Sequence, residues 1–313
     1  MTASLAIGVD VGATKIAAIL ADRSGHVLAE ERALTGAAEG VAAVVSRIAA
    51  AVQALQRAAP APIAGVGVGI PGYVDAAQGI VRNAVNLGWQ EVDLAARLRH
   101  EVRLDVWAGN DANVLALGEY YYGAAQSCAN FAYIAIGSGL GSGIVLDGKL
   151  VIGATYAAAE LGHLSLDPAG RLCACGLRGC VETVVSGPGI LATAREHLAR
   201  GERSALRDTA GLTPENVLDA ALARDPLAVA VFDETAAWLG MVFAVCAVML
   251  NPERIVIGGG LGRAAFDLLV PGALAELSRR VVPQSCAHLQ VTPSQVTAGA
   301  VGASSLVWQA ERG

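Results

Sequence analysis

The chain has 313 residues, which is enough for two domains that each bury a sizeable core. Its net charge is −6 and its Lys and Arg residues form no cluster, so nucleic acid is not an expected partner. Hydrophobic residues make up 54% of the chain and aromatic residues only 4%, so we expect a core of Ala, Val, Leu and Ile.

The N-terminus has no basic segment and reaches an acid at Asp10, which argues against a signal peptide. The longest apolar run, residues 235–250, is shorter than the ~20 residues that a bilayer span needs. We therefore expect a buried helix or a subunit contact there, and no membrane partner. Reduced cysteines, described below, favour a cytoplasmic location.

Strand and helix patterns alternate in the first part of the chain. The predicted strands, separated in part by Gly-containing turns at 12–14 and 22–25, are 5–10, 15–21, 26–30, 63–70 and 102–107. The predicted helices are 37–57, 94–100 and 112–122. The run at 63–70 is rich in Gly and β-branched residues, which is typical of a central strand.

The pattern of strand, Gly-containing turn and strand that opens the chain recurs from Phe131. A strand at 131–136, a Gly-rich turn at 137–143 and a strand at 144–146 lead through a second turn into 150–152. We interpret this as an internal duplication of two α/β halves, each opening with a hairpin whose Gly turn faces a shared cleft.

The remainder is mostly helical. Residues 187–250 contain one clear helix start at Thr213-Pro214, with Thr as N-cap and Pro in the first turn. A buried strand at 254–257 runs into a Gly-rich turn and a helix from Arg263, and the tail from Gly302 is apolar and helical.

A Gly-punctuated segment between Glu160 and Glu182 contains four candidate metal ligands: His163, Cys173, Cys175 and Cys180. Imidazole nitrogen and three thiolates form the ligand set of a closed tetrahedral zinc site. Gly176 and Gly179 allow the chain to bend back towards one centre. The alternative is a run of buried thiols or disulfides. We predict a structural zinc, because four ligands fill its coordination shell.

Glu160 and Glu182 bracket this segment. Either they are solvated surface acids, or they accept hydrogen bonds from a polyhydroxylated ligand. The residues by themselves leave both possibilities open.

Gly-rich turns after strands can bind phosphate oxygens through backbone N–H groups. The stretch Gly67 to Gly72 matches a dinucleotide fingerprint, but Pro71 does not open the required helix, and no P-loop pattern occurs. The turns at 10–14 and 137–143 remain, and with the carboxylate of Asp10 available for hydrated Mg²⁺ they predict an ATP cleft. Each turn alone is equally consistent with a tight hairpin.

The sequence Asn110-Asp111 joins a predicted strand to a predicted helix. A carboxylate at a helix N-terminus is favoured as the anion and can accept a hydroxyl proton during phosphoryl transfer. Taken alone, an N-cap is the simpler explanation for either residue.

In order along the chain, these motifs resemble the ROK family (repressor, open reading frame, sugar kinase), and among its members the bacterial glucokinases. The resemblance covers essentially the whole chain and rests on Asp10-x-Gly12-x-Thr14, Gly72 with Asn86, Asn110-Asp111, Gly137-Ser-Gly-Leu-Gly141, Glu160-x-Gly162-His163, Cys173-x-Cys175-Gly176-x-x-Gly179-Cys180 with Glu182, and the stretch Asn251 to Gly260.

The resemblance implies an α/β, actin-like fold of the ribonuclease H and hexokinase type, with two domains and a cleft between them. We predict an N-terminal domain at 1–115, completed by a helix at 302–313, and a larger domain at 116–301 that carries the zinc loop. It also implies a homodimer or a tetramer.

The resemblance further implies roles for individual residues. Asp111 would be the general base on the sugar 6-hydroxyl group, and His163 would serve both zinc and sugar. The implied sugar-binding residues are Gly72, Asn86, Asn110, Asp111, Glu160, His163 and Glu182. The implied Mg²⁺ and ATP residues are Asp10, Gly12, Thr14, Lys15, Gly137, Ser138, Gly139, Gly259 and Gly260.

We therefore expect ATP-dependent phosphorylation of D-glucose at the 6-hydroxyl group. Alternatives within the family are a kinase for N-acetylglucosamine, N-acetylmannosamine, mannose or fructose, and polyphosphate is an alternative donor. A sugar-sensing regulator is the alternative of another class. Only nine residues precede Asp10, too few for the DNA-binding segment of the family's repressors, which favours an enzyme. Ala13 and Ser138 depart from the commoner Gly and Thr, and Ser138 keeps the hydroxyl group.

Overall fold

The computed structural model describes residues 4–311. Its chain divides into two compact units. Unit 1 comprises Met1–Ser127, Gly143–Ala159 and Gln295–Gly313, and unit 2 comprises Cys128–Ser142 and Glu160–Ser294. The predicted domain boundaries at residues 115 and 301 differ from these unit boundaries and stay a prediction.

A five-stranded sheet forms the centre of unit 1, with the strand order β3-β2-β1-β4-β8. Its strands are β1 (Leu5–Val11), β2 (Lys15–Ala21), β3 (Val27–Leu34), β4 (Ile63–Ile70) and β8 (Val106–Asn110). Strand β2 pairs antiparallel with both β1 and β3, whereas β4 pairs in parallel with both β1 and β8. The predicted strands are thus confirmed, with β8 starting four residues late.

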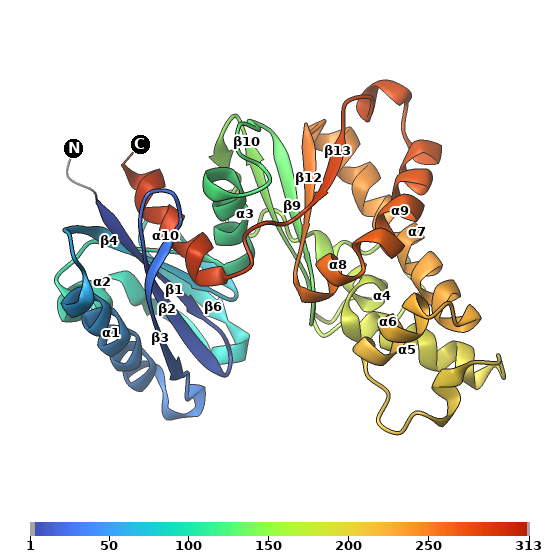
Figure 1. Cartoon of the computed structure of the whole chain (residues 1–313), viewed down its shortest axis with the longest axis horizontal. Coiled ribbons are helices and arrows are strands. Elements are labelled where there is room, and N and C mark those ends of the chain that lie inside the picture. The colour runs from blue at the N-terminus through green and yellow to red at the C-terminus, as the bar shows by residue number, and fades with distance from the viewer. Residues whose placement is uncertain (1–3, 312–313) are drawn as a thin grey trace. The chain divides into compact units, whose positions relative to one another are not determined.

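Helices cover both faces of this sheet (Figure 1). One face packs against α1 (Val41–Ala58) and α2 (Leu94–Val102), and the other packs against α3 (Asp111–Tyr122) and α10 (Gly299–Ala310). Because side chains alternate along a strand, the large residues of β1 face α1 and α2. Gly8 and Gly67 face α10: a Cβ at either position would lie 1.9 Å from a carbonyl oxygen of that helix.

A three-stranded antiparallel sheet in unit 1 was not predicted. It consists of β5 (Tyr73–Asp75), β6 (Ile80–Ala84) and β7 (Trp89–Asp93). Strands of three to five residues carry too few alternating positions for a clear pattern. This sheet lies in the chain directly after Gly72 and carries the turn that contains Asn86.

The second five-stranded sheet has the order β11-β10-β9-β12-β13. Its strands are β9 (Phe131–Ile136), β10 (Leu140–Leu146), β11 (Lys149–Leu150), β12 (Arg254–Gly258) and β13 (Gln290–Pro293). As in the first sheet, a hairpin lies on one side of the opening strand and two parallel strands lie on the other. The two sheets therefore share one strand order, as the predicted internal duplication requires. The shared cleft stays a prediction.

Unit 2 contains most of the remaining helices: α4 (Glu182–Val185), α5 (Gly187–Ala199), α6 (Pro214–Leu222), α7 (Pro226–Leu250), α8 (Gly260–Ala264) and α9 (Phe266–Arg280). The predicted start of α6 is confirmed, with Thr213 and Asn216 forming a capping box. Short 3₁₀ turns occur at Ala37–Glu39, Val85–Leu87, Leu161–His163, Ala205–Asp208 and Pro283–Ser285.

Helix α7 is longer than the predicted apolar run, because Asp233 and Glu234 lie inside the helix instead of before it. Within residues 4–311 it alone is long and apolar enough to cross a membrane by length and composition. More than half of its most apolar window is buried inside the protein, 56%. This burial is typical of a core helix, as predicted.

Candidate functional site

The four predicted zinc ligands of unit 2 come together. Their nearest donor atoms all lie within 4.8 Å of one another. The Sγ atoms of Cys175 and Cys180 are 3.5 Å apart, and Nδ1 of His163 is 3.7 Å from Sγ of Cys173. Ligands at zinc–sulfur bonds of about 2.3 Å in a tetrahedron stand about 3.8 Å apart. The donor set and its spacing therefore fit a tetrahedral metal ion.

Backbone geometry explains why the loop closes here. Gly176 and Gly179 have φ angles of 92° and 70°, in the left-handed region that favours Gly. A Cβ at Gly179 would lie 1.6 Å from the carbonyl oxygen of Asp167, so this position admits only Gly. Short bridges pair Ser165 with Cys180 and Leu172 with Arg178.

Glu182, the first residue of α4, lies against the cluster. Its Oε1 atom is 3.1 Å from Sγ of Cys173 and 3.5 Å from Nδ1 of His163. Glu160 precedes the turn that carries His163, and its carbonyl oxygen accepts a hydrogen bond from the His163 N–H at 3.0 Å. Unit 2 thus holds Glu160, His163 and Glu182 in one neighbourhood, half-buried or exposed.

The Gly turn after β9 borders a cavity within unit 2. The cavity has a volume of about 470 Å³ and is lined by Gly137, Ser138, Gly187, Pro188, Pro214, Glu215, Leu218, Gly260, Leu261 and Ala264. Gly139 lies beside Glu182, whose Oε2 atom would be 3.2 Å from a Cβ at that position. Gly259 has a φ angle of 77°, and a Cβ there would lie 2.2 Å from the Ile136 carbonyl oxygen.

Three of the predicted nucleotide residues, Gly137, Ser138 and Gly260, therefore share one cavity, whose mostly apolar walls come from α5, α6 and α8. Gly187, Pro188 and Leu218 were not predicted as site residues, and Pro214 and Glu215 were predicted only as the start of a helix. These residues come together at the cavity through packing between helices, which no local pattern of residues indicates.

The first Gly turn lies in unit 1. The N–H of Gly12 donates to the carbonyl oxygen of Lys15 at 2.9 Å, and Thr35, the residue after β3, donates its hydroxyl to the Gly12 carbonyl at 2.7 Å. Thr14 and Lys15 are exposed. The turn therefore presents its tip to solvent, while Asp10 at its base is half-buried.

The environment of Asp10 disfavours its charge. Burial, and then the nearby charge of Asp111, raise the pKa of Asp10 to about 6, against the opposing effect of Lys15. Helix α10 contributes to this burial, since a Cβ at Gly299 would lie 2.6 Å from the Asp10 carboxyl group. A carboxyl group whose pKa is raised by burial and by a second carboxylate is common at functional sites.

At the Asn110-Asp111 junction, the sequence left open which residue is the N-cap of the helix. Asn110 is the N-cap of α3: its side-chain oxygen accepts from the N–H groups of Ala112 and Asn113 at 2.9 and 3.1 Å. Its Nδ2 group donates to the carbonyl oxygen of Gly72 at 3.0 Å. Asp111 is therefore not needed as the N-cap.

Asp111 is the first residue of α3. Burial raises the pKa of its carboxyl group, while a 2.8 Å hydrogen bond from the Ala112 N–H and a bond with Asn110 act in the opposite direction. Gly72, with a φ angle of 99°, lies directly beside Asn110, and Asn86 is exposed on the turn after β6. Unit 1 thus joins Gly72, Asn110 and Asp111.

The sequence pattern of the ROK family matches residues 6–310, and the chain belongs to this family. It is 37% identical to the glucokinase of Halalkalibacterium halodurans over 273 residues, which cover 85% of this chain and 83% of that protein. It is 29% identical to the DNA-binding transcriptional dual regulator NagC of Escherichia coli, across 97% of this chain and 75% of that protein.

Among solved structures, a ROK family glucokinase from Streptomyces griseus in complex with glucose and AMPPNP is similar to this chain. Its TM-score is 0.82 and its sequence identity 34%, across 98% of this chain and 100% of that one. The predicted actin-like ATPase fold of the hexokinase type is thereby confirmed.

Proposed function

We propose that this protein transfers the γ-phosphoryl group of ATP to the 6-hydroxyl group of D-glucose. The observation that carries the proposal is the similarity to glucokinases over most of the chain, including one whose structure contains glucose and the ATP analogue AMPPNP. The Asn110-Asp111 junction supports it, because Asn110 caps α3 and leaves the carboxylate of Asp111 available for proton transfer.

In the proposed reaction, Asp111 accepts the proton of the sugar 6-hydroxyl group. The sugar oxygen then forms a bond to the γ-phosphorus of ATP, the bond from that phosphorus to the bridging oxygen breaks, and ADP leaves. Hydrated Mg²⁺ bound with ATP would neutralise phosphate charge, and Asp10 would act near it. Glu160, His163, Glu182, Asn110, Asn86 and the Gly72 backbone would bind the other sugar hydroxyl groups.

For the nucleotide, the apolar cavity beside Gly137, Ser138 and Gly260 is the proposed adenosine site, and Gly259 would lie near it. Gly139 and the turn at Gly12, Thr14 and Lys15 would bind phosphate oxygens. His163, Cys173, Cys175 and Cys180 would hold a structural zinc ion that keeps Glu182 and His163 in place. ATP and reduced thiols are both found in the cytoplasm, the location we propose.

The test measures ADP release with Mg-ATP and a panel of glucose, N-acetylglucosamine, N-acetylmannosamine, mannose and fructose. We expect the highest kcat/KM for glucose. A higher kcat/KM for another sugar would mean that this sugar, and not glucose, is the preferred acceptor, and the protein would still be a sugar kinase. A parallel series with polyphosphate tests the donor.

Calorimetric titration with the same sugars separates a kinase from a sensor. Sugar binding without ADP release or polyphosphate consumption, with wild type and Asp111→Asn indistinguishable, would contradict the kinase proposal. It would favour a sugar-sensing regulator.

A further inference from the structure

Arg171 lies in the loop from Glu160 to Glu182 that carries the four candidate metal ligands, two residues before Cys173. All five N–H groups of its guanidinium have acceptors. Nε and Nη2 donate to the two carboxylate oxygens of Glu196 at 2.9 and 2.8 Å. Nη2 also donates to Oγ1 of Thr193 at 2.9 Å. Nη1 donates to the carbonyl oxygens of Thr183 at 2.7 Å and Gly189 at 3.3 Å.

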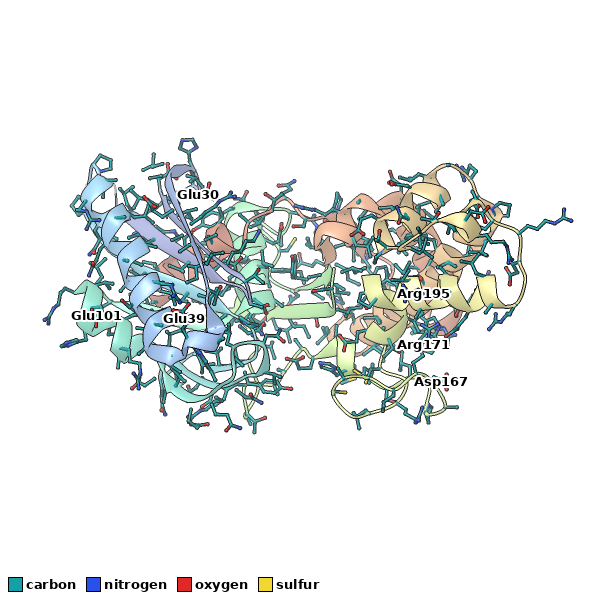
Figure 2. All side chains as sticks on the ribbon, turned by 90° about the horizontal axis from the view of Figure 1, so that it is seen from below. Glu30, Glu39, Glu101, Asp167, Arg171 and Arg195 are labelled. Atoms are coloured by element: carbon teal, nitrogen blue, oxygen red, sulfur yellow. The ribbon has the colours of Figure 1, made fainter. Side chains whose placement is uncertain are left out.

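These acceptors belong to two elements. Thr183 lies in α4, directly after Glu182, whereas Gly189, Thr193 and Glu196 lie on successive turns of α5. Figure 2 shows Arg171 between the loop that carries Asp167 and the helix that carries Arg195. One side chain therefore joins the loop to α4 and α5.

The candidate metal ligands connect different parts of the molecule from Arg171. His163 and the three cysteines all lie within the loop, so a metal ion would join one part of the loop to another. Arg171 connects this closed loop to the helices. Its side chain is only 25% exposed, and its guanidinium holds the pKa of Glu196 below the usual range.

Both ends of this connection reach proposed binding groups. At one end, Thr183 follows Glu182, whose carboxylate contacts Cys173 and His163. At the other, α5 begins with Gly187 and Pro188, which line the 470 Å³ cavity. The hydroxyl of Ser186 adds a second link, donating to the Glu182 carbonyl oxygen at 2.6 Å.

We propose that Arg171 is a positioning residue that holds the sugar-binding carboxylate of Glu182 and the nucleotide-binding start of α5 in one fixed arrangement. This inference rests on the proposed function for the identity of the two ligands. The planar fork of Arg is required, because Lys offers no bidentate geometry and cannot reach Glu196, Thr193 and two carbonyl groups together.

The first experiment compares wild type, Arg171→Lys, Arg171→Met and Arg200→Met. Arg200 is the exposed C-cap residue of α5, and its charge also lowers the pKa of Glu196, so its variant controls for lost charge. We expect Arg171→Met to raise KM for both glucose and ATP about tenfold, with a smaller change in kcat. The KM values of Arg171→Lys should lie between those of wild type and those of Arg171→Met. The control should stay within about twofold.

Unchanged KM values for both substrates in folded Arg171→Met would overturn the proposal. So would a fall in kcat alone with wild-type KM values, because displaced binding groups act on binding. A loss of thermal stability with no change in KM would identify a purely structural residue.

A second measurement does not depend on turnover. Hydrogen–deuterium exchange of the zinc-loaded protein should show faster exchange at residues 182–189 in Arg171→Met than in Arg200→Met, and the AMPPNP dissociation constant should rise by calorimetry. Equal exchange and equal AMPPNP affinity would contradict the proposal. If wild type phosphorylates no sugar, the proposed function fails, and these two readouts still decide the role of Arg171.

Discussion

Asp10 and Asp75 in unit 1 experience opposite electrostatic environments. Burial raises the pKa of Asp10, and the charge of Asp111 adds to the effect. Burial would also raise the pKa of Asp75, but hydrogen bonds from Tyr156, Arg82 and the Gln78 N–H outweigh it and hold the pKa below its usual range. Asp75 is therefore paired for stability, while Asp10 retains an unfavourable charge, as expected of a functional group.

The Asp10→Asn variant should be more stable than wild type at pH 7.5 in metal-free buffer. The folded-state pKa of about 6 lies above the unfolded value, so the folded protein loses stability as pH rises from about 4 to about 6. Removing the charge should recover about 1–3 kcal/mol of the free energy of unfolding at pH 7.5, and nothing near pH 4.

Urea unfolding at pH 4, 6 and 7.5 measures this difference. Asp75→Asn is the matched control and should have the opposite sign, because its charged form is favoured in the folded state. An Asp10→Asn protein that is less stable than wild type at pH 7.5 would contradict the argument.

The Asp111→Asn variant should bind glucose with near wild-type affinity and lose about 10²–10⁴-fold in kcat, the range for a general base. Asn keeps the size of the side chain but cannot accept the hydroxyl proton. Since burial raises the pKa of Asp111, the acid limb of the wild-type kcat/KM profile should lie above the usual carboxyl range. Near-normal turnover in the variant would remove Asp111 as the base.

At the scale of elements, the loop from Glu160 to Glu182 has little secondary structure of its own. Within the described chain, its regular structure consists of one 3₁₀ turn and two isolated bridges. A structural metal ion supplies folding free energy to a segment of this kind. Gly179 is the other requirement, since any side chain there would meet the Asp167 carbonyl group.

The Cys175→Ser variant should therefore lose about one zinc ion per chain and become sensitive to proteolysis between Glu160 and Glu182. Cys286, which lies outside the cluster, provides the control variant Cys286→Ser. Metal content by mass spectrometry and limited proteolysis measure both effects. A stable, active and zinc-free Cys175→Ser protein would rule out a structural zinc.

Elements with local signals were predicted from the sequence. The strands of the two five-stranded sheets, except β13, and the cap at Thr213 each have a pattern confined to a few residues. Strand β13 was not predicted. The sheet β5-β6-β7 was missed because its short strands gain stability from pairing with one another and not from a periodic pattern.

At the scale of the whole molecule, the chain leaves unit 1 after Ser127, returns to it for Gly143–Ala159, and returns a second time at Gln295. Glu119 connects the first of these segments to the last. The fully buried carboxylate of Glu119 holds both segments within unit 1. Its Oε1 atom accepts from the N–H groups of Gln295 and Val296 at 3.0 and 2.8 Å, and Oε2 accepts from Ala124 at 2.6 Å. The predicted homodimer or tetramer stays a prediction for a single chain.

Glu119→Gln should lower the free energy of unfolding by about 2–4 kcal/mol, because its amide NH₂ group would face backbone donors in a buried site. Glu253 is the control: it is exposed and accepts one backbone hydrogen bond, from Asn130, at 3.0 Å. Chemical denaturation of both variants makes the comparison. Equal effects of Glu119→Gln and Glu253→Gln would show that the buried carboxylate has no special role.

The amino-acid sequence by itself determined the family motifs, the Cys₃His set of candidate metal ligands and the acid after β8, because each depends on residues close together in the chain. Only the tertiary structure decided that Asn110 is the N-cap of α3 and that α5, α6 and α8 line a cavity. It also decided that the side chains of Arg171 and Glu119 connect segments that are distant in the chain. Arg171 meets Glu196 across 25 positions and Glu119 meets Gln295 across 176. Such contacts arise from the packing of distant segments, which no local pattern of residues encodes.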